Sequence, residues 1–476
     1  MASMISERRT VSLPIVSGCL RLADLVAVLG AGLIAYRAYP PAQQALAADL
    51  SLVFVVIIGL LCANGFQLAH LYTHPTLRSP LRRFGRALLA WSVVLLLFAA
   101  ALFFTKTGEN FSRGWVVSWF LIGAAGLGLN RIALSALVGL WTRDRRLCRN
   151  LVVVGAGAEA ARFIAMVEAS HNEEVEIVGV FDERLNHRRA VVAGRRLSGN
   201  IDDLTEFCRQ VHVDQIVVAM PAAAESQLAA IFGRLRQLPV AVSLCPDIKG
   251  LPLENCSLGR VADQPVLNLL DRPLSDWKWV RKEIEDRFLA AIILLLIAPL
   301  LGAVALAVKI DSPGPVFFRQ RRYGYNNQMI EVFKFRTMYH DQCDAAGEKV
   351  VKRGDSRVTR LGGFLRKTSL DELPQIINVL RGEMSIVGPR PHQAALKIDN
   401  RYYDEIVAEY AARHRVRPGI TGWAQVNGWR GEIDTVEKAV KRVEHDLYYI
   451  DNWSVLLDFK ILLLTVVAVL KRENAY

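Results

Sequence analysis

The sequence predicts a membrane protein of the α plus α/β class, with three parts in order along its 476 residues. Four apolar stretches near the N-terminus indicate a four-helix transmembrane region over residues 1–145. A strand, a glycine-containing turn and a helix then indicate a Rossmann-like α/β domain over 146–266. A further apolar stretch with a central proline indicates a monotopic last domain over 274–476, with a re-entrant helix expected at about 285–309.

The first part is apolar enough and long enough for four membrane crossings. Hydrophobic residues make up 52% of the whole chain, and the mean hydropathy is positive. The apolar stretches lie at about 16–38, 51–70, 87–105 and 115–130. Each approaches the ~20 residues that a helix needs to cross the hydrocarbon core of a bilayer. Four crossings return the chain to the side on which it starts.

The basic residues of the loops indicate which side that is. Arginines gather before the first stretch, between the second and third, and after the fourth: Arg8, Arg9, Arg78, Arg82, Arg83, Arg86, Arg143, Arg145, Arg146 and Arg149. The other two loops carry only Arg37, Lys106 and Arg113. The positive-inside rule therefore predicts that both ends of this unit are cytoplasmic. Cleavage of the first stretch as a signal peptide near 45–47 is the alternative, but three more stretches follow it.

The middle part has the pattern of a dinucleotide-binding domain. The expected elements are a strand at Leu151–Val154, a turn at Gly155–Ala160, a helix to about Ala169, a strand at Val175–Phe181 that ends before Asp182, and a strand at Gln215–Ala219. Glycines in such a turn let a pyrophosphate approach the N-terminus of the helix. Packing alone also requires glycine there, so a structural or regulatory module is favoured over a nucleotide site.

Two apolar segments of the last part are expected to meet the membrane without crossing it. Phe288–Val308 has no charge and is long enough to span, but Pro299 costs roughly 3 kcal/mol in a straight helix. Basic residues flank both of its ends, so a crossing would place one set outside the cell. A helix bent at Pro299 keeps both ends cytoplasmic; a straight fifth crossing is the alternative. Asp458 and Lys460 interrupt the final segment, Trp453–Leu470, and favour a helix that lies in the interface.

The most informative motif is the run from Arg366 to Gln375, RKTSLDELPQ. It places two adjacent carboxylates, Asp371 and Glu372, among arginines and lysines. An acidic pair in basic surroundings suits chemistry on phosphate, because one carboxylate can attack phosphorus while the other holds a divalent cation. On a helix, neighbouring side chains diverge by about 100°, which indicates different roles. Carboxylates that only stabilise a helix N-terminus are the alternative.

Other basic residues are candidates for binding phosphate oxygens. Lys334 and Arg336 alternate along a predicted strand, VFKFR, and would lie on one face, although a solvated charged face has the same pattern. Arg390 lies between two prolines in GPRP, and the restrained backbone suits a guanidinium that grips phosphate in a fork. An ordinary proline-rich turn is the competing interpretation.

Together with His414–Gln425 (HRVRPGITGWAQ), these motifs resemble the large monotopic polyprenyl-phosphate hexose-1-phosphate transferases that initiate bacterial exopolysaccharides. The resemblance runs from about Leu274 to the C-terminus. It implies an enzyme that transfers hexose 1-phosphate from a UDP-sugar to undecaprenyl phosphate and releases UMP. It also implies an inner-membrane location with a cytoplasmic catalytic domain, and the larger members of the family suggest a homodimer.

The resemblance also assigns roles to single residues. It implies that Asp371 forms a covalent phosphosugar intermediate, that Glu372 helps to hold Mg²⁺, and that Lys334 is a functional lysine. Asp451 matches an acid required in the family, although a helix N-cap is an alternative for it. Gln425 is a weaker candidate for a nucleotide or sugar contact. The lone histidines, His392 and His414, are expected to be structural.

The segment 425–432 looks most like that of members that transfer glucose 1-phosphate, so UDP-glucose is the expected donor and UDP-galactose the alternative. The family usually has serine before the helix proline, and Ala298 stands there in this chain. The net charge of +12 is concentrated beside membrane segments and around the acidic pair. Anionic lipid and nucleotide diphosphate therefore explain it better than nucleic acid. Seven cysteines without a C-x-x-C pair indicate free thiols and no zinc site.

Three other functions are weaker alternatives. A membrane-anchored nucleotide-sugar dehydratase would need a Tyr-x-x-x-Lys pair, and the chain has none. A metal-dependent glycosyltransferase would need an Asp-x-Asp pair, which is also missing from the sequence. A non-catalytic scaffold would leave the cluster of acidic and basic residues without a role.

Overall fold

The computed structural model describes residues 11–38, 48–73, 80–81, 84–106, 111–170, 175–183, 191–221, 225–245, 257–261, 264–342, 355–392, 397–398, 401–402, 407, 409–429, 431 and 435–470. The chain forms two compact units, one of which is Arg8–Cys148 and the other of which includes Arg149–Tyr476. Several loop arginines of the orientation argument (8, 9, 78, 82 and 83) and the alternative cleavage site at 45–47 lie outside the described residues.

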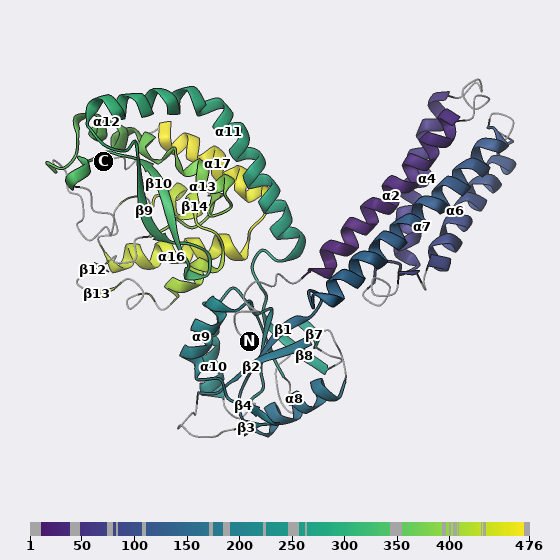
Figure 1. The fold of residues 1–476 in the computed structure, drawn as a ribbon, viewed down its shortest axis with the longest axis horizontal. Helices are drawn as coiled ribbons and strands as arrows, with labels where there is room; N and C mark the ends of the chain where they lie inside the picture. Colours follow the sequence, from purple (N-terminus) through teal and green to yellow (C-terminus); the bar gives the residue numbers. More distant parts are fainter. Residues whose placement is uncertain are drawn as a thin grey trace. The chain divides into compact units, whose positions relative to one another are not determined.

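The described part of the first unit consists of four long helices (Figure 1). They are α2 (Leu13–Ala38), α4 (Ala48–Leu68), α6 (Phe84–Phe104) and α7 (Arg113–Arg143). The four apolar helices predicted from the sequence are therefore confirmed. By length and composition α2, α6 and α7 can each cross a membrane, and α4 contributes a shorter apolar helix, Leu52–Leu68. Since α2 packs on α7 and α4, and α6 on α4 and α7, the helices form a closed bundle.

Buried tryptophans and one ion pair hold this bundle together. The indole N–H of Trp119 donates to the carbonyl oxygen of Val28 at 2.8 Å. A Cβ atom at Gly32 would lie 2.8 Å from the Trp119 ring, so the close approach of α2 and α7 requires glycine there. The carboxylate of Asp24 accepts from the buried guanidinium of Arg131 at 2.8 Å and 3.1 Å. A charge in an apolar bundle needs such a partner, and removal of either residue leaves the other uncompensated.

The middle of the chain forms an α/β module on a six-stranded sheet in the order β2-β1-β5-β6-β8-β7. The elements are β1 (Arg149–Val154), α8 (Ala158–Ala169), β2 (Val175–Phe181), α9 (Ile201–Gln210), β5 (Gln215–Val218), α10 (Glu225–Leu235), β6 (Ala241–Leu244), β7 (Ser257–Val261) and β8 (Gln264–Leu270), with a short hairpin of β3 (Val191–Val192) and β4 (Arg195–Arg196). The first four strands of the sheet are parallel and the last two antiparallel. The predicted strands and the predicted helix of this region are confirmed.

The glycine turn after β1 has a packing explanation. Gly155 adopts a φ of +122°, which side chains disfavour, and a Cβ atom there would lie 2.4 Å from the carbonyl oxygen of Ala219. Gly157 is the N-cap of α8, and Glu159 stands in the first turn of that helix. The carboxylate of Glu159 therefore lies close to the N-terminus of α8, where a phosphate would bind. Its negative charge would repel a phosphate, which favours a structural role for the turn.

The C-terminal domain combines a long helix, a β-hairpin and a group of short elements. In order they are α11 (Asp276–Asp311), β9 (Phe317–Tyr323), η4 (Tyr325–Asn327), β10 (Met329–Phe335), η5 (His340–Gln342), α12 (Arg360–Thr368), η6 (Leu370–Glu372), α13 (Gln375–Leu380), β11 (Ser385–Val387), β12 (Lys397–Ile398), β13 (Arg401–Tyr402), η7 (Tyr410–Arg415), β14 (Gly419–Thr421), α15 (Trp423–Val426), α16 (Val436–Asp451) and α17 (Val455–Leu470). β9 pairs antiparallel with β10, and β11 pairs parallel with β14. A hydrophobic core joins α13, β11, η7 and α16.

Helix α11 is longer than predicted and continues through Pro299. It begins at Asp276 rather than near 285, and its ribbon changes direction along its length (Figure 1). Of the basic residues that flank the apolar stretch, Arg281, Lys282, Arg287 and Lys309 belong to the helix itself, whereas Arg319, Arg321 and Arg322 lie on β9. Lys282 is buried. Its ammonium is paired there, at 3.1 Å from Asp286 and 2.7 Å from Asp458. Lys282 thus precedes the apolar stretch as predicted, but it is paired inside the fold.

The charges in the last helix, α17, also have a different explanation. The charge of Asp458 predicts a helix that lies in the interface, but the side chain is fully buried. It accepts hydrogen bonds from Lys282 (2.7 Å), Tyr449 (2.9 Å) and Trp453 (3.0 Å). Lys460, in contrast, is exposed and lies over the Trp423 ring. Asp458 therefore connects α17 to α11 and α16 through these hydrogen bonds.

Candidate active site

The two adjacent carboxylates lie in a short 3₁₀ turn, η6, rather than on an α-helix. Helix α12 ends at Thr368 because Ser369 adopts a left-handed conformation with φ 57°. Asp371 and Glu372 follow directly, and in a 3₁₀ turn successive side chains point about 120° apart. The predicted divergence of the two carboxylates thus holds, although the element that produces it differs.

Glu372 is held by two cations from other elements. Its Oε1 lies 3.0 Å from Lys334 Nζ, on β10, and 2.5 Å from an amino group of Arg390, in the loop after β11. A second amino group of Arg390 donates to Oε2 at 3.2 Å. Burial alone would raise the pKa of Glu372, but Arg390 and Lys334 together hold the pKa well below its usual range. Glu372 is therefore ionised and fixed in orientation.

Asp371 is in a different state. Its side chain is buried, yet within the described part of the chain no hydrogen bond or ion pair reaches its carboxylate. Burial raises the pKa of Asp371 to about 6; Lys334 opposes this rise and the charge of Glu372 adds to it. A carboxylate without hydrogen-bond partners, ionised near neutral pH, is a good nucleophile.

A buried network behind Arg390 positions its backbone. The guanidinium of Arg413 donates to the carbonyl oxygen of Arg390 at 2.8 Å and to Asp446 at 2.6 Å. The same guanidinium lies 2.5 Å from Nδ1 of His392. Burial and Arg413 lower the pKa of His392 well below its usual value, so this ring is neutral and can accept the hydrogen bond.

Sequence reasoning missed Arg413 and Asp446, and also Arg322. Arg413 directly precedes the motif that begins at His414, which is the one signal that could have pointed to it. Arg322, on β9, lies close enough to Arg390 that burial and this neighbour lower its pKa to about 10. Arg322 lies opposite Ile330 in the hairpin of β9 and β10. The sequence does not show this strand register, so it could not place Arg322 near Arg390.

The structure does not bring the remaining candidates to the acidic pair. Arg336 is buried, and its guanidinium donates to the carbonyl oxygens of Ser312 (2.6 Å) and Pro313 (2.9 Å) at the end of α11. Its predicted contact with substrate is thus replaced by a contact with backbone carbonyls. Asp451 is the exposed last residue of α16, so the alternative of an N-cap is wrong. Gln425 lies on α15, with no side-chain hydrogen bond to the described residues.

The acceptor positions of Glu372 decide whether the pair suits a metal ion. The described residues contain no group of three or more His, Cys, Asp or Glu side chains arranged to hold a metal. A carboxylate has about four acceptor positions, and the hydrogen bonds from Lys334 and Arg390 use three of those on Glu372. One position remains on Oε2, which is enough for Mg²⁺ because this ion takes its other ligands from water and phosphate oxygens.

Comparison with known proteins agrees with this arrangement. Residues 277–472 match the bacterial sugar transferase family, and residues 67–246 match a CoA-binding domain. A UDP-glucose:undecaprenyl-phosphate glucose-1-phosphate transferase of Xanthomonas campestris pv. campestris is 38% identical over 96% of this chain and 94% of the relative. The chain belongs to the family of bacterial sugar transferases.

Two other relatives show how widely the family likeness extends. The transferase with the same description from Escherichia coli K12 is 38% identical over 83% of each chain. An exopolysaccharide production protein PSS of Rhizobium leguminosarum bv. phaseoli is 47% identical over 197 residues, which are 98% of that relative and 41% of this chain. Membership in the bacterial sugar transferases decides against the dehydratase, Asp-x-Asp and scaffold alternatives.

Proposed function

We propose that this protein transfers glucose 1-phosphate from UDP-glucose to undecaprenyl phosphate, releases UMP, and so starts the repeat unit of an exopolysaccharide or capsule. The observation that carries this proposal is the match over nearly the whole length of a transferase with that activity. The pairing of Glu372 with Lys334 and Arg390, beside an Asp371 that has no hydrogen bond from the described residues, supports the assignment of the reacting residues.

The reaction proceeds in two displacements at one phosphorus atom. An oxygen of Asp371 forms a bond to the phosphorus that carries the sugar, and the bond from that phosphorus to the UMP oxygen breaks. UMP leaves with the electron pair, and the sugar phosphate stays on Asp371 as an acyl phosphate. A phosphate oxygen of undecaprenyl phosphate then attacks the same phosphorus and restores the free carboxylate. Lys334 and Arg390 face the diphosphate and bind its charge.

Mg²⁺ is the expected metal, with Glu372 as its protein ligand through the remaining acceptor position on Oε2. When bound, the ion neutralises charge on the diphosphate and on the departing UMP. Glu372 contributes a charge that Lys334 and Arg390 keep in one orientation. Removal of divalent cations with EDTA should abolish UMP release, and Mg²⁺ should restore it; full activity in EDTA would refute the metal.

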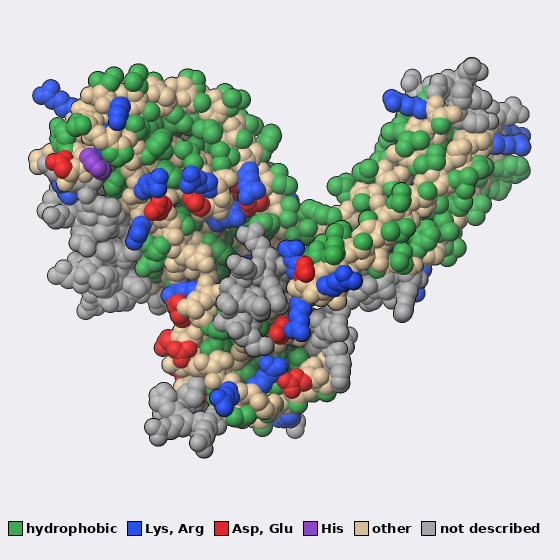
Figure 2. Space-filling model, viewed as in Figure 1, with side chains coloured by type: hydrophobic (Ala, Val, Ile, Leu, Met, Phe, Trp, Pro, Cys, Tyr) green, Lys and Arg blue, Asp and Glu red, His purple; other side chains and the backbone are tan. Residues whose placement is uncertain are grey.

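We further propose that α11 enters and leaves the cytoplasmic leaflet without crossing the membrane. One fold contacts both of its ends: Asp286 accepts from Ser385 and Ile386, while Arg336 donates to Val308 and Ser312. A spanning helix would separate these two ends across the bilayer. Its middle is apolar and exposed, with Leu295 at 78% and Leu296 at 74%, and hydrophobic side chains cover this side of the domain in Figure 2.

This topology can be tested with single cysteines at two exposed positions of α11. Arg281→Cys and Asp311→Cys should both resist a membrane-impermeant maleimide in intact cells and react after permeabilisation. Lys106→Cys, in a loop expected outside, is the control that should react in intact cells. Labelling of the Asp311→Cys variant from outside would show that α11 crosses the membrane.

The α/β module is proposed to be a Rossmann-like structural unit, and the protein to act as a homodimer at the inner membrane. The parallel strands β2, β1, β5 and β6, with a glycine turn after β1, support the first point. Analytical ultracentrifugation of the full chain in detergent would test the second.

The transfer reaction and the identity of the sugar can be tested together. The purified protein is incubated with undecaprenyl phosphate, Mg²⁺ and radiolabelled UDP-glucose, UDP-galactose or UDP-N-acetylgalactosamine. UMP and a glucose-labelled lipid diphosphate are the expected products; release of UDP, or labelling with another sugar alone, would overturn the proposal. Asp371→Asn should lower the rate by at least about 10³-fold and abolish exchange between UMP and UDP-glucose.

A further inference from the structure

Arg322, on β9, is a further cation beside the acidic pair. It lies opposite Ile330, which comes four residues before Lys334 on β10. Alternate residues of a strand point to the same face, and directly opposed residues of a hairpin share that face. Arg322 and Lys334 therefore lie on one face of the hairpin. An amino group of Arg322 also donates to the carbonyl oxygen of Pro391 at 3.4 Å, next to Arg390.

Arg322 lies at the end of this group of cations that is farther from the nucleophile. Glu372 and, less strongly, Asp371 raise the pKa of Arg390. Burial and Arg390 lower the pKa of Arg322 and Glu372 opposes them, whereas Asp371 has no part in the shift. Four strand residues, about 13 Å at the rise of a β-strand, separate Lys334 from the level of Arg322. The cations thus form a row that leads away from Asp371.

The charge of Arg322 is held by neutral acceptors. The guanidinium donates to Oε1 of Gln320 at 2.7 Å and to the carbonyl oxygen of Pro391. Among the described residues, no carboxylate forms an ion pair with it. Glu372, whose charge acts on it, already accepts three hydrogen bonds from Lys334 and Arg390. Arg322 therefore has a fixed orientation and a positive charge that these contacts do not neutralise.

Part of this guanidinium is open to solvent. Arg322 is half-buried. Its Nε has no hydrogen bond in the described part of the chain, yet it is not covered by protein, in contrast to the covered Nε atoms of Arg336, Arg413 and Arg415. A phosphate oxygen can therefore reach Nε while the two neutral acceptors hold the amino groups.

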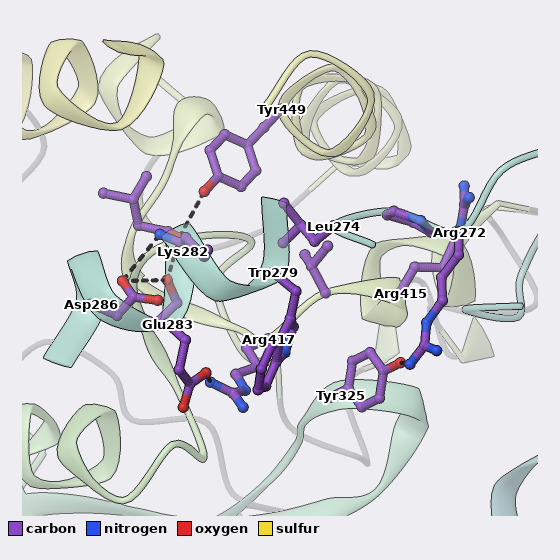
Figure 3. A pocket seen from close by; sticks show the side chains of 14 residues that line it. Arg272, Leu274, Trp279, Lys282, Glu283, Asp286, Tyr325, Arg415, Arg417 and Tyr449 are labelled. Carbon is purple, nitrogen blue, oxygen red and sulfur yellow. Dashed lines mark hydrogen bonds and ion pairs between the residues drawn. The ribbon is translucent and has the colours of Figure 1, made fainter. Parts of the chain in front are cut away.

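A separate cavity of about 120 Å³ beside α11 also contains arginines (Figure 3). Arg417 is paired there with Glu283. Among the described residues that line the cavity, none belongs to the acidic pair or to its cations. A phosphate that reacts at the acidic pair therefore meets Arg322 and not the arginines of this cavity.

The two displacements require a phosphate site on the side of the reacting phosphorus that faces away from Asp371. In the first step an Asp371 oxygen bonds to this phosphorus, and its bond to the bridging oxygen breaks; UMP keeps that oxygen with the electron pair. Attacking and leaving oxygens lie roughly in line in phosphoryl transfer. The polyprenyl phosphate must then attack from the side that UMP has left, because the Asp371 oxygen becomes the leaving group. One site for a phosphate monoester thus serves both steps.

We infer that Arg322 binds this phosphate monoester, which is the phosphate of UMP as it departs and that of the polyprenyl phosphate as it attacks. The inference rests on the proposed transfer reaction and assigns one residue to both substrates. The positive charge offsets the negative charge that appears on the bridging oxygen when UMP leaves. Gln320 and the Pro391 carbonyl keep the guanidinium in place between the two steps.

The advantage of UMP over uridine as an inhibitor tests the first contact, because uridine lacks only the phosphate. Both compounds are titrated against the transfer of glucose phosphate from UDP-glucose. In the Arg322→Gln variant the ratio of the two inhibition constants should fall about 10- to 100-fold, as expected for the loss of a hydrogen bond to a charged group. This ratio does not depend on the fraction of folded protein. Arg322→Lys, which keeps the charge but not the fork, should lose less.

The second contact is measured on protein that carries the labelled sugar phosphate, after removal of UDP-glucose and UMP. The KM for undecaprenyl phosphate should rise by a similar factor in the Arg322→Gln variant. Spontaneous hydrolysis of the intermediate, which involves no second phosphate, should keep its rate. Arg321→Gln is the matched control, since Arg321 is exposed and lies on the other face of the hairpin, and it should keep the wild-type values in both measurements.

The outcomes separate this inference from the proposed reaction. An unchanged ratio of UMP to uridine in the Arg322→Gln variant, or an effect on only one of the two steps, would overturn the inference and leave the transfer reaction intact. An equal loss in the Arg321→Gln variant would assign the effect to net charge and also contradict the inference. Failure of the wild-type protein to form the labelled intermediate would overturn the proposed reaction, and the inference with it.

Discussion

At the scale of single residues, the surroundings give two adjacent carboxylates opposite properties. Glu372 has three hydrogen bonds from Lys334 and Arg390, which keep it charged. Asp371 has no such bond within the described residues, and burial raises its pKa. One carboxylate is therefore a fixed charge, while the other is free to react.

The pKa of Asp371, about 6, predicts how the rate depends on pH. The nucleophile must be deprotonated, and a raised pKa means that the active form is lost as the pH falls through 6. Between pH 7.5 and 5.5 the ionised fraction, and with it the single-turnover rate of UMP release, should fall about fourfold. Stopped-flow or quench measurements across this range test the value, and a rate that stays constant down to pH 5 would contradict it.

Two variants should move this midpoint in opposite directions. Lys334 lowers the pKa of Asp371, so Lys334→Met should shift the midpoint upward. The charge of Glu372 raises that pKa, so Glu372→Gln should shift it downward. Both variants should also be slower, but only an electrostatic effect predicts shifts of opposite sign in the pH profiles. Shifts in the same direction would show that a general loss of structure dominates.

The same scale shows which site residues the sequence can predict. Asp371, Glu372, Lys334 and Arg390 lie in short motifs whose chemistry is recognisable, and the structure brings them together. Arg336 has the same charge as Lys334 and lies two residues after it, which predicts the same face of the strand. The strand, however, ends at Phe335, and the Arg336 guanidinium donates to a carbonyl oxygen at the end of α11. The direction of a side chain beyond the end of a strand depends on tertiary packing, and a sequence motif does not predict it.

At the scale of elements, helices α11 and α17 depend on one another. Neither apolar helix alone explains its charged residues, but Lys282 of one pairs with Asp458 of the other. The hydroxyl of Tyr449 also donates to Asp458, so α16 joins the same contact. The pair is separated by 176 residues in the sequence, so no local pattern predicts that Asp458 is buried against Lys282.

Asp458→Asn should therefore destabilise the domain strongly. The substitution leaves the buried Lys282 with Asp286 as its remaining close carboxylate, and the loss of one partner from a buried pair costs about 3–5 kcal/mol. Thermal unfolding of the detergent-solubilised protein measures this loss. Lys460→Gln on the same helix is the control, because an exposed residue should change stability by less than about 0.5 kcal/mol. Equal effects of the two changes would refute the role of Asp458.

Pro299→Ala tests the bend of α11. Alanine restores the missing backbone donor and removes the ring clash, worth roughly 3 kcal/mol in favour of a straight helix. A straighter α11 should expose the Asp311→Cys position to the impermeant maleimide in part of the molecules and lower the activity. Unchanged labelling with full activity would mean that the contacts at the two ends of α11 are sufficient to shape it.

At the scale of the whole molecule, the chain combines units that are stabilised separately. The four-helix unit has its own core of tryptophans and its own ion pair between Asp24 and Arg131. The C-terminal domain has another core, and the Rhizobium relative corresponds to that region almost alone. Catalysis should therefore need only the last part of the chain.

A fragment of residues 266–476 should remain active in detergent with undecaprenyl phosphate. Its rate of UMP release should stay within about tenfold of that of the full chain, or ~1.4 kcal/mol in the activation free energy. The same fragment with Asp371→Asn is the control for background hydrolysis. A folded fragment without activity would show that the N-terminal parts contribute to the site.

The sequence by itself determined the four apolar helices, the α/β module and the acidic pair with Lys334 and Arg390, because hydrophobic periodicity, glycine turns and short motifs are local properties of the chain. Only the tertiary structure decided which charges are buried. Lys282 with Asp458, Arg413 with Asp446, and Arg336 with the end of α11 are contacts between distant segments, and a charge can be buried only where folding supplies its partner.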